Sequence, residues 1–184
     1  MKPVERSEIL DYLTYTDRRP GIRTGVLGAK RLRRIVQGPL TWLFENRDTV
    51  RYQVQEMMRV ERLVRESDIE HELKTYNELL GGPGELGVTL LIGLDDEALR
   101  DEKLHAWLGL LNCLFAELPD GTRVPPTWDP RQVGTDRLSS VQYLKFDVRG
   151  QAPVAMVCTN PDPLLPERAE LTEEQRRALA EDLA

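Results

Sequence analysis

Residues 31–65 constrain the fold most, because the spacing of their apolar side chains changes from that of a strand to that of a helix. Apolar and polar residues alternate over 31–37 and again over 40–45, and the turn pair Gly38-Pro39 separates the two runs. Period-two alternation on both sides of such a pair predicts a β-hairpin. Pro39 has no N–H to donate, which places it at the turn or on a sheet edge.

The helix that follows the hairpin is predicted to begin at Asn46, whose side-chain oxygen can accept a hydrogen bond from a first-turn N–H. Val50 and Val54 begin an apolar stripe at helical spacing, which predicts a helix over 48–65. Six charged or amide side chains surround this strand-to-helix junction: Glu45, Arg47, Asp48, Arg51, Gln55 and Glu56.

Two interpretations of these six side chains remain open. In the first, they form a solvated helix face, in which residues three and four apart support one another. In the second, they bind an anionic small molecule, because free N–H groups and arginines favour anions and carboxylates. Arg47 and Arg51 would then clamp the anion, Glu56 would be the candidate base and Gln55 would position the ligand.

The same region resembles the hallmark of an uncharacterised bacterial family, the domain-of-unknown-function family DUF3501. The motifs that carry the resemblance are Gly38-Pro39, the run from Leu43 to Val50, the run from Gln53 to Met57, and Glu61-Arg62. The similarity covers most of the chain, although only this central motif is specific. The resemblance implies a cytosolic bacterial protein without an assigned reaction, often encoded near rubrerythrin-like proteins and iron–sulfur oxidoreductases.

The remaining pattern predicts an α+β fold, with a mainly antiparallel sheet of about six strands. Helices over 48–65 and 68–80 are expected to pack on one face of this sheet, and an amphipathic helix ends the chain. Residues 110–118 fit either a strand or the continuation of a helix, and we favour the strand because a turn signal follows it.

We expect one domain over residues 1–184, divided into three parts by composition. Residues 1–30 are predicted to form a short helix and a basic loop, 31–160 the core, and 161–184 a proline-rich linker and the last helix. The loop containing Trp128 is expected either to pack on the core or to place this aromatic side chain at the wall of a pocket.

Composition limits the compartment and the partners. The net charge of −6 argues against general binding to nucleic acids or to an anionic membrane surface, despite the basic residues between 18 and 34. Neither a signal peptide nor an apolar run long enough to span a membrane is visible. The two cysteines, Cys113 and Cys158, form no metal-binding spacing and suit a reducing cytoplasm.

A metal site has weak candidates. The pairs Asp68/His71 and Glu102/His105 each place a carboxylate and an imidazole three residues apart on a predicted helix. Di-iron bundles use such spacing, with further glutamates from two other helices. We predict no cofactor. The negative charge of Asp68 is already explained by its place at a helix start, and a helical bundle conflicts with several predicted strands. Non-haem iron is the alternative.

Two classes of function follow. The first is a non-catalytic accessory or interaction protein of a bacterial redox, iron–sulfur or oxidative-stress pathway, with a redox or iron–sulfur protein as its partner. The second is an enzyme or sensor that binds an anionic small molecule at the junction between Glu45 and Glu56. Homo-oligomerisation is compatible with either class.

Overall fold

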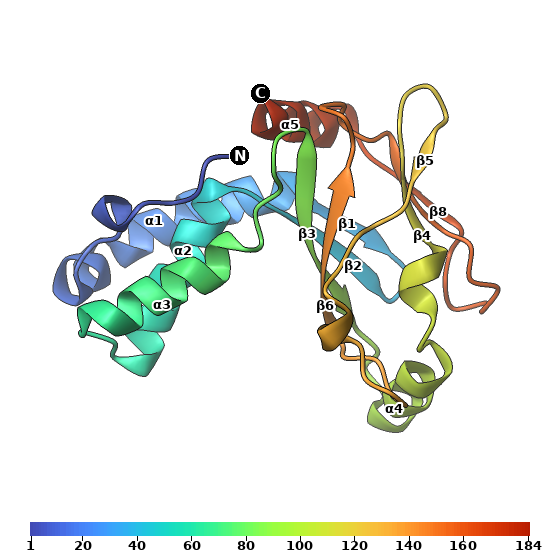
Figure 1. Cartoon of the computed structure of the whole chain (residues 1–184), viewed down its shortest axis with the longest axis horizontal. Coiled ribbons are helices and arrows are strands. Elements are labelled where there is room, and N and C mark those ends of the chain that lie inside the picture. Colours follow the sequence, from blue (N-terminus) through green and yellow to red (C-terminus); the bar gives the residue numbers. More distant parts are fainter.

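Two lobes make up the computed structural model, which describes all residues from 1 to 184 (Figure 1). The helical lobe consists of α1 (Tyr12–Leu32), α2 (Arg47–Glu61) and α3 (Glu66–Asn77), preceded by the 3-10 turn η1 (Arg6–Glu8). The β lobe contains eight strands, the helices α4 (Glu97–Ala106) and α5 (Glu173–Leu183), and the 3-10 turns η2 (Leu110–Cys113) and η3 (Pro130–Gln132). The C-terminal helix predicted from the sequence is confirmed.

The strands form two antiparallel sheets of four strands each, whereas the sequence suggested one sheet of about six. Sheet A has the order β1-β2-β3-β6, and its strands are β1 (Arg34–Gln37), β2 (Leu40–Glu45), β3 (Glu85–Ile92) and β6 (Val141–Asp147). Sheet B has the order β5-β4-β7-β8, and its strands are β4 (Leu114–Glu117), β5 (Arg123–Val124), β7 (Ala155–Cys158) and β8 (Arg168–Glu170). The predicted α+β class holds, and the expected single sheet was wrong.

The main core joins the two sheets. Trp42 and Phe146 of sheet A lie with their ring centroids 6.2 Å apart, and Leu114 and Met156 of sheet B belong to the same buried cluster. The segment predicted to be a linker contains the strand β8. It packs on the protein because Leu165 and Leu171, on either side of this strand, are buried in the main core. Burial of these two side chains holds the proline-rich segment against β7.

The helical lobe has its own core, so α2 and α3 do not pack on a sheet face as the sequence suggested. Val50, Val54 and Met58 of α2 meet Ile69 and Leu73 of α3 in a cluster separate from the one between the sheets. Figure 1 shows the three helices side by side, beyond the edge of the sheets. The apolar stripe that the sequence assigned to a sheet is therefore buried between helices.

The predicted basic loop within residues 1–30 is part of α1, a helix of 21 residues. Pro20 and Gly21, which suggested a turn, lie on its exposed side. Tyr15 and Val26 are buried on the opposite side against the rest of the helical lobe. The packing of this face outweighs the weak helix propensity of glycine and proline, which costs about 1 to 3 kcal/mol per residue.

Of two local predictions, the cap at Asn46 is confirmed and the strand over 110–118 is confirmed in part. Asn46 caps α2, its Oδ1 accepting a hydrogen bond of 3.0 Å from the Thr49 amide. Within residues 110–118, a 3-10 turn comes first and the strand β4 begins only at Leu114. None of the helices combines the length and the apolar composition needed to cross a membrane.

Candidate functional site

Glu45 is the side chain on which the strand-to-helix junction is built. Its two carboxylate oxygens accept hydrogen bonds from the hydroxyls of Thr49 on α2 (2.5 Å) and Thr89 on β3 (2.7 Å). Because Thr49 also bonds to Asn46, a single network ties the end of β2 to its neighbouring strand and to the helix start. Both of its oxygens are therefore engaged within the protein.

The two candidate arginines at the junction are paired with acids. Arg47 donates to Glu8 (2.7 Å) and to the carbonyl oxygen of Pro3 (2.5 Å). Arg51 forms an ion pair of 2.6 Å with Asp48 and lies 3.7 Å from Glu8. A hydrogen bond from a backbone amide, together with these arginines, lowers the pKa of Glu8. The arginines therefore hold the N-terminal segment on α2.

Glu56 and Gln55 fix α1 and the segment before it. Arg19 donates two hydrogen bonds to the Glu56 carboxylate, of 2.7 and 2.8 Å, and the hydroxyl of Tyr15 donates a third of 2.7 Å. The bonds from Arg19 lower the pKa of Glu56 to about 2. The carboxamide of Gln55 bonds to both the amide and the carbonyl of Leu10, at 2.8 and 3.1 Å.

The six junction residues thus fall into separate groups: Glu45 ties β2 to β3 and to α2, and the other five make their contacts within the helical lobe. Their charges are matched by residues outside the predicted set, above all Glu8 and Arg19. For Arg47 and Arg51 to clamp an anion, they would first have to leave Glu8 and Asp48. A binding role for the junction stays a prediction.

The four weak metal candidates do not converge. Asp68 and His71 lie on α3 in the helical lobe, whereas Glu102 and His105 lie on α4 at the far end of the β lobe (Figure 1). His105 bonds through Nδ1 to the carbonyl oxygen of Asp136 (2.8 Å). No group of three or more His, Cys, Asp or Glu side chains lies close enough to hold a metal ion. The spacing within each pair was real, but the fold separates the pairs.

A cleft of about 800 Å³ lies where α3 faces the outer side of sheet A. Tyr76 and Leu79 form the wall on the α3 side, and Tyr143 and Lys145 of β6 form the floor. Trp128 closes the opposite side and also packs against the main core. Burial raises the pKa of the Tyr76 hydroxyl above its usual value. The aromatic side chains offer stacking surface at small cost in conformational entropy.

The loop that carries Trp128 is fixed to the free edge of β6. Thr127 and Lys145 exchange two backbone hydrogen bonds, of 2.7 and 2.8 Å. The side chain of Gln132 binds both backbone groups of Tyr143, each at 2.8 Å, in place of a neighbouring strand. These four bonds hold the wall of the cleft in position without any ligand.

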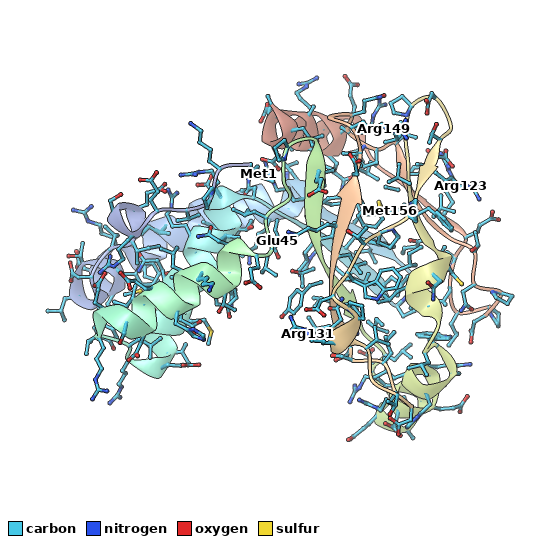
Figure 2. All side chains as sticks on the ribbon, in the orientation of Figure 1. Met1, Glu45, Arg123, Arg131, Arg149 and Met156 are labelled. Carbon is cyan, nitrogen blue, oxygen red and sulfur yellow. The ribbon has the colours of Figure 1, made fainter.

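Four charged side chains line the cleft. Asp129 and Arg131 pair with one another at 2.9 Å, and this contact lowers the pKa of Asp129 to about 2. Arg131 lies beside the end of β6 in Figure 2. Glu78 and Lys145 make no ion pair and no side-chain hydrogen bond within the protein. The cleft is therefore lined by one unpaired carboxylate, that of Glu78, and one unpaired ammonium, that of Lys145.

Sequence reasoning identified only Trp128 among these residues. The other lining side chains come from α3 and β6, which lie far apart in the chain. A local signal did exist, since Tyr143 and Lys145 occupy the polar side of a strand whose other side is apolar. Nothing in the sequence indicated that α3 would stand opposite them.

The fold and the cleft define an α+β protein with a ligand-sized cavity at the meeting of a helical lobe and a β lobe. The model of the family described as a protein of unknown function (DUF3501) matches residues 3–183, so the chain belongs to this family. The resemblance seen in the central motif is thereby confirmed.

A crystal structure of a protein of unknown function from Burkholderia pseudomallei K96243 is similar over its whole length. The two chains are 26% identical, the match covers 100% of each, and the TM-score is 0.86. No match was found among curated proteins.

Proposed function

We propose that the protein is a non-catalytic accessory protein that binds an organic small molecule in the cleft between α3 and sheet A. The observation that carries the proposal is the cleft itself, with Tyr76, Trp128 and Tyr143 around about 800 Å³. Drug-sized ligands commonly occupy cavities of roughly 300 to 1,000 Å³, lined by aromatic side chains and a few polar groups.

The preformed geometry of the cleft supports binding. The backbone of the loop is bonded to β6 at Lys145 and Tyr143, so the cavity does not have to be assembled by the ligand. A preorganised site spends little free energy on ordering when it binds. The lining contains no Ser, Cys or His side chain, and a binding role needs none.

The pathway stays a prediction from the family resemblance. If the protein acts in a pathway with redox or iron–sulfur proteins, the cleft would be a sensor site, in which a bound molecule alters the contact with a protein partner. A protein partner, a homo-oligomer and the absence of a cofactor are likewise proposals that the cleft neither requires nor opposes.

Nuclear magnetic resonance tests the proposal with the neutral probe 2-naphthamide. The protein has three tryptophans, and ¹⁵N-labelled protein therefore gives three indole N–H signals. Trp42 and Trp107 are buried, whereas Trp128 lines the cleft. We expect the probe to move the Trp128 signal alone, which Trp128→Phe assigns by removing it.

Two variants make the test specific. Tyr143→Ala removes an aromatic side chain that is 48% exposed, so the fold should tolerate it, and we expect binding to weaken by about tenfold. Leu13→Ala is the matched control, because Leu13 is an exposed apolar residue on the helical lobe, away from the cleft. Binding that Leu13→Ala weakens as much as Tyr143→Ala, or no movement of the Trp128 signal, would refute the proposal.

A further inference from the structure

Lys145 is placed as an anchor for a ligand. It points from the outer side of β6 into the cleft, and its side chain is half-buried. Its partner across sheet A is Gly87, which has no side chain that could pair with the ammonium. The nearest acid on its own side of β6 is Asp147, which accepts a hydrogen bond from the backbone of Arg149 (3.2 Å). The ammonium therefore makes no ion pair inside the protein.

Protection of the strand edge does not account for this lysine. Lysines on edge strands often serve to prevent another strand from pairing there. The edge of β6 is already covered, since Thr127 bonds to the backbone of Lys145 and Gln132 to that of Tyr143. The charge is thus not needed to protect the edge, and it faces the cavity.

The other charges of the cleft leave Lys145 as the free cation on the floor. Arg131 is neutralised by Asp129, with which it forms an ion pair. Glu78 is exposed at the C-terminal end of α3, on the rim. Its charge opposes anions weakly, because a solvent-exposed charge is screened by water and salt. Lys145 is therefore the cation of the lining that has no ion-pair partner, and it lies on the floor.

We propose that the ligand of the cleft is an aromatic carboxylate whose carboxylate binds the Nζ of Lys145. This inference rests on the proposed binding function and names the ligand class. The ring lies among Tyr76, Trp128 and Tyr143, and the carboxylate accepts a charge-assisted hydrogen bond from the ammonium. The anion site that the sequence suggested at the junction stays a separate prediction; the cleft differs from it because its cation makes no ion pair.

The test compares 2-naphthoate with 2-naphthamide, which share one ring system and one shape and differ in charge. Binding of each is measured by the shift of the Trp128 indole signal. We expect the wild-type protein to prefer the carboxylate by about tenfold, because a hydrogen bond between charged groups is stronger than one between neutral groups. Lys145→Gln should abolish this preference, so that the two probes bind with equal affinity.

Glu78→Gln is the matched variant, because the charge that it removes is opposite in sign to that of Lys145. It removes a negative charge from the rim, so it should slightly raise the affinity for 2-naphthoate relative to that for 2-naphthamide. Equal binding of the two probes, or a preference that survives Lys145→Gln, would overturn the inference while the binding function stands. Failure of both probes to shift the Trp128 signal would overturn the inference and the binding function together.

Discussion

Replacing Glu56 by glutamine tests whether this carboxylate holds α1 onto α2. Glu56 accepts hydrogen bonds from Arg19, Tyr15 and Arg59, and its pKa falls from 4.5 to about 2. Such a fall corresponds to about 3 kcal/mol, since each tenfold change in proton affinity is worth about 1.4 kcal/mol. Because the side chain is 16% exposed, water weakens the contact and we expect a loss of about 2 kcal/mol at pH 7.

The pH dependence gives this prediction its sign. The folded protein holds the Glu56 carboxylate ionised, so the stabilisation is fully present above pH 4.5 and is lost as the pH falls towards 2. Urea unfolding of the wild-type protein and of Glu56→Gln should therefore give curves that differ at pH 7 and converge between pH 4.5 and pH 2. Glu61→Gln, at the exposed end of the same helix, should match the wild type throughout.

A difference between Glu56→Gln and the wild type that does not change with pH would refute this reasoning, because it would show that the charge contributes nothing. The same variant also addresses the junction hypothesis. If it lost the binding of 2-naphthoate without a loss of stability, Glu56 would have to be assigned to a ligand site rather than to the contact between α1 and α2.

Two further variants test other contacts by urea unfolding. Gly87→Ala would place a Cβ atom 1.7 Å from the carbonyl oxygen of Leu79 and should lower the free energy of unfolding by about 3 kcal/mol. In the control Gly93→Ala, the new Cβ would meet nothing closer than 4.0 Å, and the loss should be under about 0.5 kcal/mol. Equal losses in the two variants would contradict this packing. Asp182→Asn breaks the ion pair of 2.6 Å with Arg33, in which both side chains are 9% exposed. It should lower the free energy of unfolding by about 3 kcal/mol, because it leaves a buried charge unpaired. A loss below about 1 kcal/mol would show that this contact does not hold α5 in place.

Local signals in the sequence predicted the elements whose stability is local. The cap at Asn46 and the hairpin depend on neighbours within a few residues, and both are present in the structure. The hairpin begins at Arg34 and not at residue 31, because α1 extends to Leu32. The final helix was likewise predicted, from its amphipathic pattern.

The features that depend on distant partners were missed. α1 is helical because one face meets α2, as shown by the bonds of Tyr15 and Arg19 to Glu56, although its glycines and Pro20 suggest turns. The division into two sheets depends on which strands pair, and periodicity carries no information on pairing. The cleft was missed for the same reason, since its walls come from α3, β6 and the loop before β6.

The loop that ends at Gln132 limits how the proposed ligand site can differ among members of this family. Its backbone and its glutamine cover the only open edge of β6 while Trp128 forms the wall of the cavity. Shortening or remodelling it would expose a strand edge to pairing between molecules, which leads to aggregation. Relatives with other ligands are therefore expected to keep the loop's length and its backbone bonds, and to differ in the side chains that point inward, such as Trp128 and Lys145.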